Sequence, residues 1–200
     1  SRVVAKALAR TGPLLLRLGT ESQRQKILPG IVRGDLAFCI GLSEPDSGSD
    51  LAGLRTRADR TADGWKLNGR KVWTTFAHLS DYMIALVRTS PAPEGGSRHI
   101  GLSQFLVDLK TPGITIRPIR DLVGEEGFNE VTFDDVLLPD DALVGQEGAG
   151  WAQATSELAF ERSGPDRILS SYPLLAAAVD VLKDDPTAAV PVGREVARLW

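Results

Sequence analysis

The sequence predicts an α+β fold in which a helical segment, an antiparallel β-barrel or sandwich and the start of a C-terminal helical bundle follow one another. Three observations predict it. Apolar residues recur at helical spacing in residues 3–32, short strand-like runs separated by Gly, Pro and Asp turns fill residues 36–145, and helical spacing returns from Gly150. These patterns predict three domains, at residues 1–35, 36–146 and 147–200.

The first helical segment runs from Val3 to Val32 and is interrupted twice. Its apolar spacing is broken at Thr11-Gly12-Pro13 and at Leu18-Gly19-Thr20. We expect Thr20 to cap the helix that begins at Glu21, because a threonine hydroxyl before a helix accepts a hydrogen bond from a first-turn N–H.

The middle of the chain contains a series of short predicted strands. They are Phe38–Leu42, Thr56–Arg60, Trp65–Asn68, Lys71–Thr75, Tyr82–Thr89, Leu102–Leu109, Ile114–Ile119 and Glu130–Phe133. Asn68-Gly69 is a strong hairpin signal because both residues tolerate positive φ, so we expect a turn there. On the strand that follows, Trp73 and Thr75 would share one face and Thr74 would lie on the other. Composition predicts an exposed loop at Pro91–Ser97.

The last part of the chain is predicted to be helical. Trp151, Ala154 and Leu158 recur at three- and four-residue spacing, and few turn formers interrupt them before Gly164-Pro165. Leu174 to Leu182 continues the pattern, Asp184-Asp185-Pro186 breaks it, and Val192 to Trp200 begins another helix. That helix ends on apolar residues without a capping glycine or polar tail, so we expect the chain to be part of a longer protein.

Composition excludes several classes of protein. The 200 residues carry a formal net charge of −3, and their Lys and Arg are scattered, which argues against a nucleic-acid binder. The single Cys39 excludes an internal disulfide and a cysteine metal cluster, and we interpret it as a buried small residue; no metal site is expected. No apolar run approaches the roughly 20 residues that span a bilayer, and no leader pattern is visible, so we expect a cytoplasmic protein.

Residues 38–50 place small hydroxyl and glycine residues after a buried strand. Ser43 and Ser49 supply hydroxyls that donate and accept hydrogen bonds, which suits a ring edge or a pyrophosphate. Pro45 and Gly48 favour a tight loop, and Gly48 lets backbone N–H groups approach an anion. The alternative is an ordinary turn, because the same residues dominate turns for local reasons.

Residues 68–75 add an indole flanked by hydroxyls. Trp73 beside Thr75 could support one side of an isoalloxazine ring and donate to a ring nitrogen. The alternative is that Trp73 is a core aromatic residue.

Together these segments resemble the acyl-CoA dehydrogenases. The resemblance is carried by Leu42-Ser43-Glu44-Pro45-x-x-Gly48-Ser49-Asp50, Asn68-Gly69-x-Lys71-x-Trp73-x-Thr75, Phe133-Asp134-Asp135-Val136-x-x-Pro139 and Gly148-x-Gly150-Trp151. It extends from about Gly19 to about Arg167 and is specific at the level of the superfamily, since both the order and the spacing of the motifs agree.

The resemblance implies FAD as the cofactor. It places the Leu42 backbone and the Ser43 hydroxyl at the pyrimidine edge of the flavin, Ser49 near the pyrophosphate and the acyl-CoA, Trp73 against the ring system, and Thr75 near N5. Gly48 and Thr74 complete the implied cofactor-binding set. Such groups orient and tune a flavin, while the redox chemistry belongs to the cofactor.

The same resemblance implies α,β-dehydrogenation of an acyl-CoA thioester to a 2,3-enoyl-CoA, which needs a base for the α proton. In the family this carboxylate usually lies deep in the C-terminal helical domain, so we assign no catalytic residue in this chain. Glu161 either contacts the acyl-CoA or is a surface carboxylate paired with an arginine. We assign His78 to a turn, although it could reach the flavin pocket, and His99 has no assigned role. Glu125-Glu126 is interpreted as a solvated acidic face, although the segment beside Phe128-Asn129 could approach the CoA.

The expected protein is therefore an FAD-dependent acyl-CoA dehydrogenase of fatty acid metabolism. The resemblance implies an acyl-CoA substrate, an electron-transferring flavoprotein as acceptor, and a homodimer or homotetramer, with no nucleic acid and no membrane span. Two alternatives remain open. One is a flavin oxidase or monooxygenase on the same scaffold, and the other is a non-catalytic subunit of a hetero-oligomeric dehydrogenase.

Overall fold

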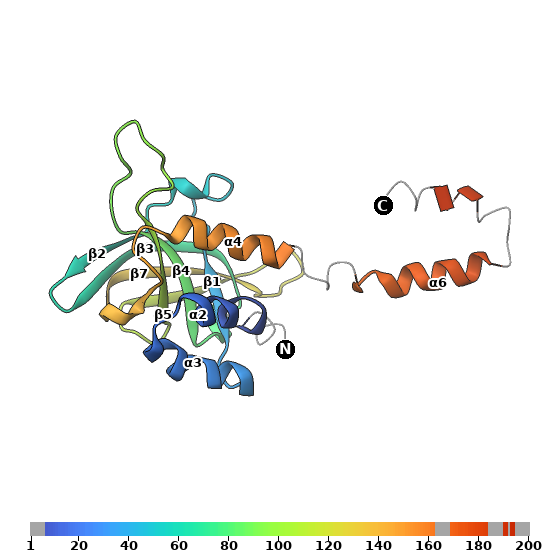
Figure 1. Cartoon of the computed structure of the whole chain (residues 1–200), viewed down its shortest axis with the longest axis horizontal. Coiled ribbons are helices and arrows are strands. Elements are labelled where there is room, and N and C mark those ends of the chain that lie inside the picture. Colours follow the sequence, from blue (N-terminus) through green and yellow to red (C-terminus); the bar gives the residue numbers. More distant parts are fainter. Residues whose placement is uncertain (1–6, 163–168, 184–189, 192, 195–200) are drawn as a thin grey trace. The chain divides into compact units, whose positions relative to one another are not determined.

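The computed structural model describes residues 7–162, 169–183, 190–191 and 193–194 of the chain. It divides into two compact units, Ser1–Leu158 and Ala159–Trp200 (Figure 1). The two units are groups of residues that contact one another more than they contact the rest of the chain. They do not test the predicted domains at residues 1–35, 36–146 and 147–200, which remain a prediction.

The first unit begins with short helices that pack on a sheet. A π-helical turn, η1 (Ala7–Thr11), leads into α2 (Gly12–Leu18) and α3 (Glu21–Arg33). The Thr20 side chain accepts a hydrogen bond from the Gln23 N–H and the Gln23 side chain accepts one from the Thr20 N–H, so the predicted cap is confirmed as a reciprocal capping box. The apolar face of α2 and α3 packs against Phe38, Ile84, Leu106 and Val144 of the sheet.

The sheet has eight strands joined by turns and short 3-10 helices. The strands are β1 (Phe38–Gly41), β2 (Arg57–Thr61), β3 (Gly64–Thr75), β4 (Tyr82–Arg88), β5 (Leu102–Asp108), β6 (Ile114–Ile119), β7 (Phe128–Leu138) and β8 (Leu143–Val144). The 3-10 helices are η2 (Leu51–Gly53), η3 (Ala77–Leu79) and η4 (Asp140–Ala142). The strand order is β6-β7-β3-β2-β4-β5-β8, and β1 pairs with β4 beside this path.

The predicted α+β fold class is confirmed, but the sheet is not closed into the barrel that was one of the two expected arrangements. Its two end strands, β6 and β8, do not pair, so the sheet is open. Pro118 lies in β6 and cannot donate a ladder hydrogen bond, which is typical of an edge strand. The sheet is also mixed, because β1 and β2 both run parallel to β4. Parallel neighbours need a crossover connection, and for β1 and β4 the β2–β3 hairpin lies in that connection.

The expected turn at Asn68-Gly69 is wrong. β3 passes straight through these residues with a register shift against β7 between Leu67 and Gly69, and the hairpin turn lies instead between Thr61 and Gly64. Gly69 has φ 139°, and a Cβ there would lie 2.6 Å from the Thr56 Cα. Close approach of a neighbouring backbone, and not a turn, therefore requires this glycine.

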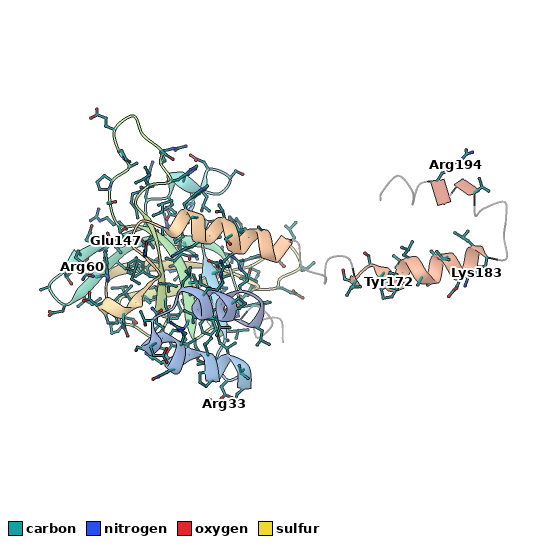
Figure 2. The ribbon with its side chains drawn as sticks, in the orientation of Figure 1. Arg33, Arg60, Glu147, Tyr172, Lys183 and Arg194 are labelled. Atoms are coloured by element: carbon teal, nitrogen blue, oxygen red, sulfur yellow. The ribbon has the colours of Figure 1, made fainter. Side chains whose placement is uncertain are left out.

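A large apolar core lies along β3, β4, β5 and β7. Trp65 and Phe105 meet edge to face in it, with ring centroids 5.1 Å apart. Arg60, labelled on the β2–β3 hairpin in Figure 2, places its guanidinium carbon 4.6 Å from the centroid of the Trp65 ring. Its Nη1 lies 2.7 Å from Asp140 Oδ1. Cys39 is buried, as expected, and its thiol donates toward the Tyr82 carbonyl.

Helices α4 and α6 follow the sheet in the chain. α4 (Gly150–Arg162) begins at the glycine where helical spacing returns, so that prediction is confirmed. α6 (Tyr172–Leu182) contains the predicted Leu174–Leu182 segment, with Tyr172 and Lys183 labelled at its ends in Figure 2. The predicted break at residues 184–186 lies outside the described residues, as does most of the predicted helix at 192–200. Among the described helices, none has the length and apolarity required to cross a membrane.

Candidate functional site

The segment that follows β1 forms a tight turn and is called here the serine segment (residues 42–50). Glu44 and Ser47 exchange two backbone hydrogen bonds, of 2.9 and 3.1 Å, around Pro45 and Asp46. η2 follows directly and leads toward β2. The turn predicted from Pro45 and its neighbours is therefore present.

The serine segment lies against the second half of β3. The Val72 N–H donates to the Ser43 carbonyl at 2.9 Å. The Lys71 ammonium donates to the Leu42 carbonyl at 3.0 Å and to Glu44 Oε1 at 2.8 Å. The structure therefore brings Leu42 and Ser43 to the part of β3 that carries Trp73, although 29 residues separate Leu42 from Lys71.

A buried ion pair holds this contact together. Lys71 is fully buried and Glu44 is 7% exposed, and Glu44 also accepts from the Arg55 and Thr56 N–H groups at 2.6 and 3.0 Å. Burial lowers the pKa of the Lys71 ammonium to about 8, and the Glu44 charge opposes this only in part. Burial acts to raise the pKa of the Glu44 carboxyl, but the Lys71 charge and the accepted hydrogen bonds together bring it below its usual 4.5.

Trp73 is presented on the surface by a strained backbone. It has φ 58° and lies in a register shift of the β3–β7 pairing between Lys71 and Thr74. Positive φ is rare for a bulky side chain, and such strain concentrates at functional sites. The indole is 58% exposed, and its edge meets Phe128 with ring centroids 6.0 Å apart. The alternative that Trp73 is a core aromatic residue is therefore excluded.

Thr74 and Thr75 complete the end of β3. Thr74 is 1% exposed, and its hydroxyl has no hydrogen-bond partner among the described residues. Thr75 is half-buried and pairs with Phe128. Thr74 is thus more buried than either Trp73 or Thr75.

A side-chain network reaches Thr74 from the neighbouring strand. Asn129 of β7 is fully buried, and its Nδ2 donates to the Thr74 carbonyl at 3.1 Å. Its Oδ1 lies 2.9 Å from Nδ1 of His78, a residue of η3. His78 is thus in a short helical turn, as expected, but it is also linked to the end of β3.

The far end of the serine segment is held by the loop between β4 and β5. Arg98 donates to both carboxylate oxygens of Asp50 at 2.9 Å. The Arg88 guanidinium donates to four carbonyls, two of them belonging to Arg98 and Ala52. His99, for which the sequence indicated no role, stacks on Trp151 of α4 with ring centroids 3.9 Å apart. In the same loop between β4 and β5, Pro91–Ser97 is exposed except for the half-buried Ala92, which agrees with the exposed loop predicted from composition.

Gly48 and Ser49 lie in the part of the serine segment that faces solvent. Both are exposed, and a Cβ added at Gly48 would have no heavy atom within 4 Å. No described residue therefore requires glycine at position 48. Glu161 lies in α4, but its side chain is outside what the structure describes, so the structure does not place it against the other predicted site residues.

Comparisons with known proteins identify this arrangement. Residues 39–136 match the model of the acyl-CoA dehydrogenase middle domain. The chain carries the middle domain of the acyl-CoA dehydrogenase family. The resemblance inferred from the sequence motifs is therefore confirmed.

Its relatives include named acyl-CoA dehydrogenases of Mycobacterium tuberculosis. The family member FadE34 is 46% identical over 151 residues, which cover 75% of this chain and 21% of FadE34. The family member IpdE1 is 46% identical over 151 residues, which cover 76% of this chain and 38% of IpdE1. The chain thus spans well under half the length of these two relatives.

Several solved structures share the fold of this chain. The Tcur3481-Tcur3483 steroid ACAD matches with a TM-score of 0.76 and 32% identity, covering 98% of this chain and 52% of that one. The ChsE4-ChsE5 complex from Mycobacterium tuberculosis matches with a TM-score of 0.70 and 35% identity, covering 78% and 39%. The FAD complex of PigA matches with a TM-score of 0.70 and 29% identity, covering 77% and 40%.

Proposed function

We propose that this acyl-CoA dehydrogenase chain binds FAD through the serine segment and the end of β3. The observation that carries the proposal is the exposed, strained Trp73 held beside Ser43 by the Val72–Ser43 hydrogen bond. An exposed indole offers a flat apolar surface for a ring, and the adjacent backbone and hydroxyl groups offer polar contacts for its edge.

The described residues fit a flavin on chemical grounds. Leu42 and Ser43 would hold the pyrimidine edge, Trp73 the ring face and Thr75 the N5 side, with Thr74 beside it. Gly48 and Ser49 would face the pyrophosphate, because exposed backbone N–H groups and a hydroxyl suit an anion. The open space around Gly48 agrees with a ligand at this site.

In the proposed reaction an acyl-CoA thioester loses its α proton and its β hydrogen to give a 2,3-enoyl-CoA. Bound FAD would accept the β hydrogen as hydride. The described residues of this chain would bind and orient, since the bulged β3 and the Glu44–Lys71 pair fix the site before ligand arrives. Ser49 and Glu161 would contact the acyl-CoA, and we assign no proton-abstracting base in this chain.

The comparisons support two refinements of substrate and assembly. A steroid-bearing acyl-CoA is a candidate substrate beside a fatty acyl-CoA, because the chain is 32% identical to the Tcur3481-Tcur3483 steroid ACAD over 98% of its length. A hetero-oligomer of two different subunits is a candidate assembly beside a homodimer or homotetramer, because two matched structures are each named for two proteins. An electron-transferring flavoprotein would accept the electrons, and a cytoplasmic location remains proposed.

The test uses the full-length protein, purified alone and co-expressed with a related dehydrogenase subunit. The flavin is released and identified, and the holoprotein is mixed anaerobically with fatty acyl-CoAs and steroid acyl-CoAs. Bleaching of the flavin absorbance with formation of enoyl-CoA supports the proposal. Absence of bound FAD, or no bleaching with any thioester in either preparation, contradicts it. Rapid reoxidation in air with release of peroxide would instead identify an oxidase.

A further inference from the structure

A chain of hydrogen bonds joins the surface to the end of β3. It begins at the exposed His78 imidazole, whose Nδ1 lies 2.9 Å from Asn129 Oδ1. It continues from Asn129 Nδ2 to the Thr74 carbonyl at 3.1 Å. The amide in the middle is fully buried. A buried amide with a partner at each end has one orientation and is held rigidly.

The chemistry of the partners fixes the direction of every donor. The Thr74 carbonyl can only accept, so the Asn129 amide must turn its NH₂ toward Thr74 and its oxygen toward His78. The imidazole nitrogen that faces this oxygen must therefore carry a hydrogen. All the dipoles then point the same way, from imidazole to amide to peptide carbonyl, and such chains polarise one another.

The peptide at the end of this chain is held in an unusual stretch of backbone. Trp73 and Phe76, which flank Thr74 and Thr75, both have positive φ, at 58° and 55°. The Phe76 N–H is fixed by the Gly127 carbonyl at 2.8 Å. Backbone of this kind persists only where its surroundings enforce it.

We propose that His78 and Asn129 are positioning residues of the flavin site, which hold and polarise the peptide group between Thr74 and Thr75. The proposal rests on the proposed function, in which Thr75 lies on the N5 side of the flavin, and adds that the Thr75 N–H donates toward N5. A hydrogen bond accepted by the Thr74 carbonyl makes the Thr75 N–H of the same peptide a stronger donor. His78 thus acts on the flavin through Asn129 and Thr75 without touching it.

Strand pairing alone does not account for the hydrogen bonds that link His78, Asn129 and Thr74. Thr74 and Asn129 already face each other in the β3–β7 ladder, so the side-chain bond is additional. Farther along the same two strands, Asn68 makes a comparable tie: its Nδ2 donates to Asp135 Oδ1 at 2.8 Å and its Oδ1 accepts from the Asp135 N–H at 2.9 Å. That tie is exposed and involves neither His78 nor the end of β3. Asn68 is therefore the matched control.

The test measures how tightly the full-length protein binds oxidised and reduced FAD, and the midpoint potential of the bound flavin. A donor toward N5 stabilises the oxidised ring, whose N5 carries a lone pair, and loses its acceptor when N5 carries hydrogen. In His78→Leu we expect about tenfold weaker binding of oxidised FAD and unchanged binding of reduced FAD. By linkage the midpoint potential then rises by about 30 mV, the equivalent of a tenfold change for a two-electron couple.

Two further variants separate positioning from folding. His78→Asn keeps a side-chain donor at the distance of Nδ1 and should restore binding and potential to within about twofold of the unaltered protein. Asn68→Ala should leave both unchanged. Equal weakening of oxidised and reduced FAD in His78→Leu would mean a purely structural role and overturn the inference, as would an unchanged potential.

The experiment also separates this inference from the function on which it rests. If the unaltered protein binds no FAD, both fail. If it binds FAD that no acyl-CoA reduces, the proposed reaction fails, while the affinities and the potential still decide the role of His78.

Discussion

Lys71 and Glu44 form a buried ion pair whose Nζ and Oε1 atoms lie 2.8 Å apart. The pair joins β3 to the serine segment, because the same ammonium also donates to the Leu42 carbonyl at 3.0 Å. Since Leu42 and Ser43 are proposed to meet the flavin edge and Trp73 its face, this contact fixes the two halves of the proposed site relative to each other.

The first prediction concerns the stability that depends on this pair. Lys71→Met leaves the Glu44 carboxylate buried without its cation, and we expect a loss of about 3–5 kcal/mol in the free energy of unfolding. Arg70→Met is the matched control, because neighbouring Arg70 is exposed and makes a surface pair with Glu130 at 3.4 Å. Its loss should be below about 1 kcal/mol. Urea denaturation measures both, and equal losses would show that the buried pair has no special weight.

The second prediction concerns acid. The pKa of Glu44 is lower in the folded protein than its usual 4.5, so the unfolded chain binds its proton first as the pH falls. The contribution of Glu44 to stability is complete above pH 4.5 and is lost as the pH falls through the folded pKa. The difference in unfolding free energy between the unaltered protein and Glu44→Gln should therefore shrink steadily on acidification below that value. A difference that stays constant from neutral pH downward would contradict this.

Local signals were sufficient to predict several elements. Thr20 caps α3 as expected, because an N-terminal cap is made within one turn of the chain. The predicted strand Ile114–Ile119 agrees with β6, and α4 begins at the expected Gly150. In each case the residues that determine the element are its own residues or their immediate neighbours.

The turn at Asn68-Gly69 shows where local reasoning failed. The dipeptide has the chemistry of a tight turn, but its glycine is required by Thr56, 13 positions earlier in the chain, and its asparagine by Asp135, 67 positions later. The parallel pairing of β1 and β2 with β4 and the open edge of the sheet likewise depend on tertiary contacts. No pattern within a short window reports such contacts.

The candidate site was predicted in part for the same reason. The motifs pointed to Ser43 and Trp73, and the structure brings their backbones together through Val72. The role of Lys71 became visible only once Glu44, 27 residues away, was seen beside it, and Asn129 lies 55 residues from Thr74. The available signal for Lys71 was a lysine inside an otherwise half-buried strand. The sequence offered no comparable signal for Asn129.

The third prediction contrasts two glycines. A Cβ at Gly69 would lie 2.6 Å from Thr56 Cα, whereas one at Gly48 would meet no heavy atom within 4 Å. Gly69→Ala should therefore cost about 1–3 kcal/mol of unfolding free energy, because backbone must shift. Gly48→Ala should change stability by less than about 0.5 kcal/mol. If Gly48 faces the FAD pyrophosphate, the same variant should still weaken FAD binding about tenfold, as followed by flavin fluorescence; unchanged FAD affinity would remove Gly48 from the site.

The fourth prediction concerns Glu161, which is proposed to contact the acyl-CoA. Glu161→Gln keeps the size of the side chain and removes its charge, so a contact role predicts a rise of about tenfold in the acyl-CoA dissociation constant while bound substrate still reduces the flavin. Glu147→Gln is the control, because Glu147 is exposed just before α4 and belongs to no part of the proposed site (Figure 2).

Anaerobic stopped-flow mixing separates binding from reduction in both variants, because the two steps respond differently to acyl-CoA concentration. Unchanged binding with abolished reduction in Glu161→Gln would give Glu161 the role of the proton-abstracting base, and would show that the assignment of no catalytic residue to this chain is wrong. No effect on either step would leave Glu161 as a surface carboxylate paired with a nearby arginine, since a carboxylate on an exposed helix face contributes little to affinity or rate.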